Sequence, residues 1–177
     1  MFRGFFSLVV FAVGVMIFTA VPGSTTAAQT PDPTEQLRPF ADKIVSILTD
    51  PDLQGEEKCI LRREKVMEVA SERFDFEEMS KRVLGRTWRT LDKNDQDYFV
   101  SLFKRLLEHA YIGKIEDYSE QRVVFKDQRV RDDRAQVDTD IVDKDVVITV
   151  SYIVILKGDT WKVYDIVVEG VSLIRNY

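Results

Sequence analysis

A chain of 177 residues is long enough to bury one hydrophobic core, and its net charge of −5 argues against a nucleic-acid-binding protein. Nucleic-acid binding depends on clustered Lys and Arg, and this sequence has no basic block. The single histidine, His109, and the single cysteine, Cys59, exclude a histidine-based metal cluster and an intramolecular disulfide. We expect Cys59 to be a small buried hydrophobe.

The amino terminus is typical of a secretory signal peptide. Arg3 precedes an apolar run over residues 5–18, which is shorter than the run of about 20 apolar residues that a membrane-spanning helix needs. Small residues then lead to Ala28 and form a site that a signal peptidase accepts. The sequence therefore predicts a signal peptide over residues 1–28, cleavage near Ala28, and a single soluble, exported domain over residues 29–177.

Apolar residues recur at helical spacing through the first part of the exported domain. The pattern predicts one helix that runs from about Leu37 and ends at Pro51. It predicts a second helix over residues 56–74, with Ile60 and Val66 among the residues that face inward. These two elements form an amphipathic pair.

Two further helices are predicted before the character of the sequence changes. The third spans residues 76–84, and Gly85 follows it in the position of a left-handed C-terminal cap. Asp92 can cap the start of the fourth helix. Its wide apolar stripe comprises Phe99, Leu102, Phe103, Leu106, Leu107, Ala110 and Tyr111.

After the fourth helix, the apolar period changes to two, which is typical of strands. Short alternating runs occur over residues 123–125 and 137–141, and the run over residues 146–156 predicts a central strand with one deeply buried face. Gly158-Asp159 predicts a tight hairpin turn into a strand over residues 161–168. Helices followed by strands predict an α+β fold in which the helices pack on a curved antiparallel sheet of at least four strands.

Three segments carry a further signal together: Phe74-Asp75-Phe76-Glu77-Glu78-Met79, Leu84-Gly85-Arg86-Thr87-Trp88-Arg89, and the closing WKVYDIVVEGVSLIRNY. They resemble the MlaC/toluene-tolerance family of periplasmic phospholipid-binding proteins. The resemblance covers nearly the whole exported domain and implies a nuclear-transport-factor-2-like fold around an apolar cavity. Related chains usually continue past the final Asn-Tyr with a short helix, so the resemblance also implies a terminal segment that this sequence does not include.

The function implied by the resemblance is that of a periplasmic carrier. It would shuttle phospholipid between an outer-membrane lipoprotein-porin complex and an inner-membrane ABC transporter that carries a substrate-binding ring, and so maintain outer-membrane lipid asymmetry. The implied carrier is not an enzyme and needs no cofactor or metal. The predicted lipid-contacting residues are Met79, Val83, Trp88, Phe99, Phe103, Leu106, Tyr111, Val150, Tyr152, Tyr164 and Ile166. For each of them, a place in the packed core is the alternative.

Other interpretations of single residues stay open at this point. Trp88 and Arg89 fit a pocket mouth, where the guanidinium would meet a headgroup phosphate, and they equally fit an ordinary surface pair. Asp165 and Glu169 lie within an apolar run, where they satisfy backbone donors or pair with an arginine.

Two alternative functions remain beside the carrier. Cone-shaped folds of this general kind also host enzymes, in which Asp165 would serve as a general base in an apolar pocket. An adaptor whose groove receives a partner helix is the other alternative. No G-x-S-x-G elbow, phosphate-binding P-loop or G-x-G-x-x-G motif occurs in the sequence.

Overall fold

Four α-helices precede a five-stranded sheet in the computed structural model of the chain, which describes residues 30–116, 121–144 and 146–176. The predicted signal peptide lies outside the described residues. The α-helices are α1 (Pro33–Leu48), α2 (Cys59–Arg73), α3 (Phe76–Leu84) and α4 (Lys93–Glu116). The strands are β1 (Arg122–Arg131), β2 (Arg134–Asp143), β3 (Val146–Lys157), β4 (Thr160–Val168) and β5 (Val171–Ser172). Short 3-10 helices are η1 (Pro51–Leu53), η2 (Glu56–Lys58), η3 (Gly85–Thr90) and η4 (Ile174–Asn176).

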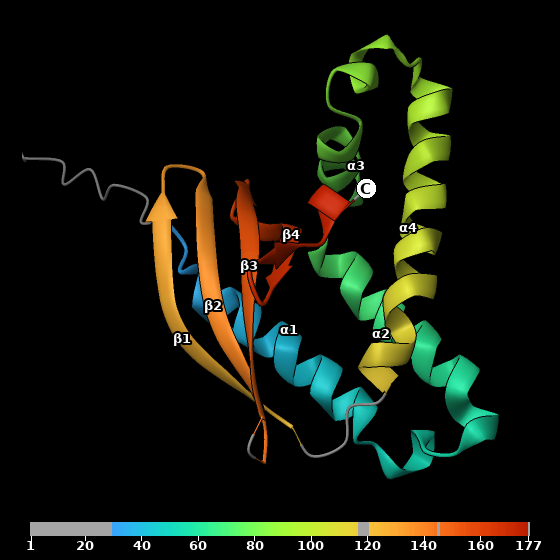
Figure 1. Cartoon of the computed structure of the whole chain (residues 1–177), viewed down its shortest axis with the longest axis vertical. Helices are drawn as coiled ribbons and strands as arrows, with labels where there is room; N and C mark the ends of the chain where they lie inside the picture. Colours follow the sequence, from blue (N-terminus) through green and yellow to red (C-terminus); the bar gives the residue numbers. More distant parts are fainter. Residues whose placement is uncertain (1–29, 117–120, 145, 177) are drawn as a thin grey trace, which may run out of the picture.

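The sheet is antiparallel throughout and its strands follow chain order, β1-β2-β3-β4-β5. Figure 1 shows a curved sheet with α1 crossing one face and with α3 and α4 beyond β4. The predicted α+β class and curved antiparallel sheet are therefore confirmed. The predicted hairpin after β3 is also confirmed, because Gly158 has a φ of +60° at the first position of the two-residue turn.

Side chains at the helix ends explain where several helices begin. The Asp32 carboxylate accepts a hydrogen bond from the Glu35 N–H at 3.0 Å, and Pro33 occupies the first helical position of α1. Asp75 caps α3 in the same way, at 2.9 Å from the Glu78 nitrogen. Asp92 accepts from Asp95 N–H at 2.9 Å, as its predicted capping role requires.

Two apolar clusters cover opposite faces of the sheet. One contains Leu37 of α1 with residues of β2, β3 and β4, and Val154 is a fully buried member of it. The other contains residues of α3, α4 and η4, and Ile153 packs against it. Because neighbouring residues of a strand point to opposite faces, Ile153 and Val154 separate the two clusters. Phe74 packs against both of them at the β4 side of the sheet.

Several predicted burial patterns are wrong. Ile60 was expected inside but is 72% exposed, since it lies in the first turn of α2 with its side chain toward solvent. The first half of β3 is less buried than predicted, with Val146 58% exposed and Ile148 37% exposed. Figure 1 shows that α1 diverges from the sheet toward the end where the β2–β3 hairpin lies, so the helix does not cover the first half of β3.

Two local expectations need smaller corrections. Gly85 ends α3 with a positive φ of 54°, but its ψ of −118° lies outside the left-handed helical region that was predicted. Cys59, which was expected to be buried, is the first residue of α2 and is only half-buried. Within the described parts of the chain, no helix is both long and apolar enough to cross a bilayer.

Candidate functional site

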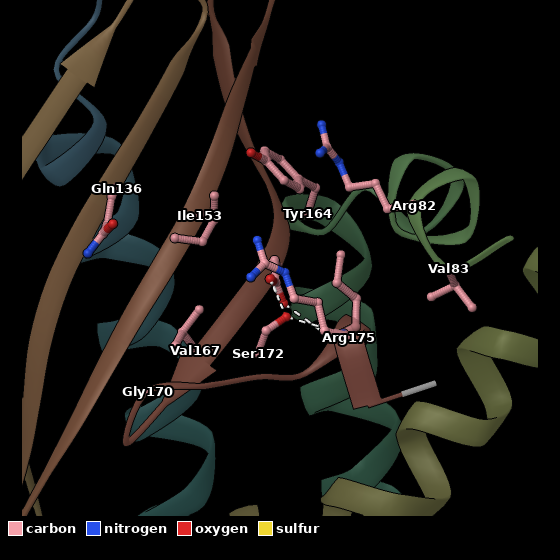
Figure 2. A pocket seen from close by; sticks show the side chains of 11 residues that line it. Arg82, Val83, Gln136, Ile153, Tyr164, Val167, Gly170, Ser172 and Arg175 are labelled. Carbon is pink, nitrogen blue, oxygen red and sulfur yellow. Dashed lines mark hydrogen bonds between the residues drawn. The ribbon is translucent and has the colours of Figure 1, made fainter. Parts of the chain in front are cut away.

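A cavity of about 650 Å³ lies between the sheet, the β4–β5 turn, η4 and α3. This volume falls within the range of roughly 300–1,000 Å³ that is typical of small-molecule sites. Figure 2 shows the side chains that surround it. The lining residues are Arg82, Val83, Gln136, Ile153, Tyr164, Asp165, Val167, Gly170, Ser172, Ile174 and Arg175. The lining thus combines apolar and polar groups, whereas an apolar cavity was expected.

A β-bulge in β4 builds the sheet side of the cavity. Ile153 pairs with Asp165, but the next residue of β3, Val154, pairs with Val163, so Tyr164 is the extra residue of β4. The bulge brings both Tyr164 and Asp165 to the cavity, although they are adjacent in the strand. A regular strand would have sent one of them to the opposite face.

Asp165 fastens the end of the described chain to the sheet. Its carboxylate is buried, accepts a hydrogen bond from the Ser172 hydroxyl at 2.6 Å, and accepts a second from the Ile174 N–H at 3.3 Å. The Ser172 hydroxyl oxygen in turn accepts from the Arg175 N–H at 3.2 Å, and Figure 2 shows this chain of hydrogen bonds. The Glu169 carboxylate accepts from the Thr149 N–H at 2.6 Å. Both acids therefore bind backbone donors, one of the two roles expected for them.

Two arginines bring positive charge to the cavity from different elements. Arg82, on α3, forms a 2.7 Å ion pair with Glu78 and places its guanidinium carbon 3.9 Å from the centre of the Tyr164 ring. Its Nε atom is buried and has no hydrogen-bond acceptor. Arg175, on η4, is exposed, and the structure gives its guanidinium no ion pair within the described residues.

The general-base alternative meets an obstacle in this arrangement. Asp165 and Tyr164 do line the same cavity, as an acid-base site would require. However, each carboxylate oxygen of Asp165 already accepts a hydrogen bond from the segment that it holds in place.

No group of three or more metal-binding side chains occurs in the described part of the chain.

Comparison with known proteins now identifies the family. The family model described as MlaC protein matches residues 38–177. The chain belongs to the MlaC family. A solved structure of a phospholipid-binding protein from Ralstonia solanacearum, in complex with a phospholipid, has 25% sequence identity and a TM-score of 0.73 to this chain, with 83% of each chain covered. A comparison with curated protein sequences gives no match.

In this MlaC-family chain, the predicted lipid-contacting residues divide between the two faces of the sheet. Val83 and Tyr164 line the cavity itself. Three more belong to the apolar cluster on the cavity side and pack behind it, namely Met79, Phe99 and Phe103. Lipid contact by these five residues stays a prediction.

Three predicted residues lie on the α1 side of the sheet instead. Tyr152 and Ile166 pack against the apolar cluster of Leu37, and Val150, which is buried, pairs with Val168 on the same face as Tyr152. Removal of Tyr152 from water raises the pKa of its phenol, and a hydrogen bond with Thr139 opposes that rise. The structure therefore does not bring these residues to the cavity between the sheet and α3.

The remaining predicted residues occupy other places. Trp88 is buried in η3, where the Lys81 ammonium lies 5.9 Å from its ring centre, and Arg89 is exposed; neither residue lines the cavity. Leu106 is 46% exposed on α4. Tyr111 lies in α4, but its side chain falls outside what the structure describes.

Sequence reasoning missed both cavity arginines and most of the polar lining. Arg82 lies in a run of charged residues on α3, and an (i, i+4) pair with Glu78 is the usual interpretation of that spacing. Arg175 belongs to the closing segment that carries the family resemblance, which was the available signal for its importance. Nothing local indicated that the two would line one cavity.

Proposed function

We propose that this chain binds a phospholipid in the 650 Å³ cavity and carries it across the periplasm. The observation that carries the proposal is this cavity, in an MlaC-family chain that shares the fold of a protein solved with a phospholipid. The exchange partners are an outer-membrane lipoprotein-porin complex and an inner-membrane ABC transporter with its substrate-binding ring. The signal peptide over residues 1–28 directs export, and cleavage near Ala28 releases the mature carrier.

The apolar part of the lining provides the driving force for lipid uptake. Each methylene group removed from water contributes about 0.8 kcal/mol, so two acyl chains crossing an aqueous compartment need cover. Val83, Ile153 and Ile174 line the cavity and also belong to, or pack against, the apolar cluster that contains Phe103. Acyl chains that enter between the sheet and α3 would extend this cluster.

Lipid extraction tests the binding step. Protein exported to a periplasm and purified without detergent should carry about one phospholipid per chain in native mass spectrometry. Lipid-stripped protein should take phospholipid up again from vesicles, and it should pass it to acceptor vesicles that contain none. Protein that neither retains nor takes up phospholipid would overturn the proposal.

A further inference from the structure

We propose that Arg82 and Arg175 form a phosphate-binding subsite at the cavity, which selects ligands that carry a phosphate group. The inference rests on the proposed function for its ligand, because the phosphate in question is that of the lipid headgroup. Both arginines line the cavity, one from α3 and one from η4. Guanidinium groups recognise phosphate oxygens through paired, charge-assisted hydrogen bonds.

Arg82 is held in place before any ligand arrives. Glu78 binds one terminal nitrogen at 2.7 Å, and the Tyr164 ring lies under the guanidinium with 3.9 Å between the guanidinium carbon and the ring centre. These contacts leave the buried Nε without an acceptor. A buried donor without a partner is costly, and a ligand oxygen that accepts from it removes that cost.

Arg175 is presented by the segment that Asp165 fastens. Hydrogen bonds from Ser172 and Ile174 to Asp165, and from the Arg175 N–H to Ser172, hold the segment that leads to this arginine and the arginine's own N–H. The backbone N–H of Arg175 is therefore held in place, and its exposed guanidinium is open to a ligand. Figure 2 shows the Arg175 side chain extending from η4 and the Arg82 side chain extending from α3.

Most of the other charged and polar groups at or beside the cavity are already engaged. Glu78 is paired with Arg82, and both Asp165 oxygens accept hydrogen bonds. The Ser172 hydroxyl donates to Asp165, and the Gln136 amide nitrogen donates to Asp138 at 2.7 Å. Arg82 Nε and the Arg175 guanidinium therefore remain as the charged donors available to an anion in this cavity.

Arg89, for which the sequence left a pocket mouth and an ordinary surface position equally open, supplies a matched control. Arg89 is exposed, lies on η3 and does not line the cavity. Arg89→Gln removes the same charge from the protein as Arg82→Gln or Arg175→Gln does. General effects of net charge on vesicle binding are therefore common to all three variants, and effects of the subsite are confined to two of them.

The experiment compares two lipids with the same tails. Lipid-stripped wild type and variants are incubated with vesicles that contain either phosphatidylglycerol or diacylglycerol, and bound lipid is counted by native mass spectrometry. Arg175→Gln and Arg82→Gln should each lower phosphatidylglycerol binding by about tenfold or more, whereas diacylglycerol binding should be unchanged. Arg89→Gln should bind both lipids as the wild type does. Arg82→Lys should not restore binding, because lysine lacks the Nε donor.

Three outcomes would overturn the inference. Phosphatidylglycerol binding that is unchanged in Arg175→Gln and Arg82→Gln would do so directly. An equal loss of both lipids would show that these arginines shape the cavity rather than recognise phosphate. If inorganic phosphate alone raises the melting temperature of the wild type but not of Arg175→Gln, and lipid binding is the same in both, the subsite takes free phosphate and the headgroup assignment is wrong.

The test also separates this inference from the proposed function. Wild-type protein that binds diacylglycerol and phosphatidylglycerol equally, with no effect of either arginine, would leave the carrier role intact and remove the subsite. Wild-type protein that binds neither lipid would remove the carrier role and with it the headgroup assignment. Because Arg82→Gln also breaks the ion pair with Glu78, its melting temperature is measured alongside, and Arg175→Gln, with its exposed side chain, tests the subsite without that loss.

Discussion

A single bulky substitution distinguishes the cavity face of β4 from its packed face. Val167 lines the cavity, whereas Val163 is completely buried in the cluster on the α1 side of the same strand. A larger side chain in a packed core costs about 1–3 kcal/mol, which corresponds to a fall in melting temperature of about 2–12 °C for a chain of this size. A tryptophan at Val167 has about 650 Å³ of space beside it. We therefore expect the melting temperature of Val163→Trp to be lower than that of the wild type by at least about 2–12 °C. The melting temperature of Val167→Trp should be close to that of the wild type.

The two variants should also differ in ligand binding. Val167→Trp should reduce the phospholipid bound per chain, because the indole occupies space that the ligand would fill, whereas the folded fraction of Val163→Trp should bind as the wild type does. Thermal unfolding followed by circular dichroism gives the first comparison, and native mass spectrometry gives the second. The reasoning is refuted if Val167→Trp melts as low as Val163→Trp, or if it is stable and retains a full complement of lipid.

Three further predictions address export, the β3–β4 turn and an ion pair. Replacement of the apolar run over residues 5–18 by polar residues should keep the precursor in the cytoplasm, and mature protein in the periplasmic fraction would contradict the signal peptide. Gly158→Val should lower the free energy of unfolding by about 1–2 kcal/mol. The φ of Gly158 is +60° and no atom lies within 4 Å of an added Cβ, so the cost is backbone strain alone. An unchanged denaturation midpoint would contradict this prediction. The hydrogen bond to Asp75 raises the pKa of Lys157, so the stability from this pair should be present below about pH 10 and lost as the pH rises through the folded-state pKa. Urea unfolding at several alkaline pH values should show that loss in the wild type and not in Lys157→Met. If the free energy of unfolding depends on pH in the same way in both proteins, the predicted role of the ion pair is wrong.

The order and type of the elements followed from local signals in the sequence. Asp92 predicts a helix start because a carboxylate there satisfies otherwise free N–H groups, and the structure contains its hydrogen bond from the Asp95 N–H. Gly158 predicts the hairpin because a positive φ is needed at that position. Such signals depend on residues close in sequence, so tertiary packing did not need to be known.

The distribution of side chains between the faces of the sheet was not predictable in the same way. Strict alternation along β4 assigns Tyr164 and Ile166 to one face, but the bulge sends Tyr164 to the cavity and leaves Ile166 on the α1 side. A bulge is defined by pairing with the neighbouring strand, which the sequence of β4 alone does not contain. Helical periodicity failed similarly at Leu106, because it identifies an apolar stripe without saying how much of the stripe a partner covers.

The same bulge links the end of the described chain to the shape of the cavity. It points Asp165 and Tyr164 to one side, so that Asp165 can hold Ser172 and the start of η4 while the Tyr164 ring supports Arg82. Cavity geometry therefore depends on contacts around β4 and η4, whereas the cluster of Leu37 lies across the sheet and contributes to stability from the other face. Because Leu37 lies across the sheet from the cavity and does not line it, substitutions at Leu37 should lower the free energy of unfolding without changing which ligand the cavity prefers.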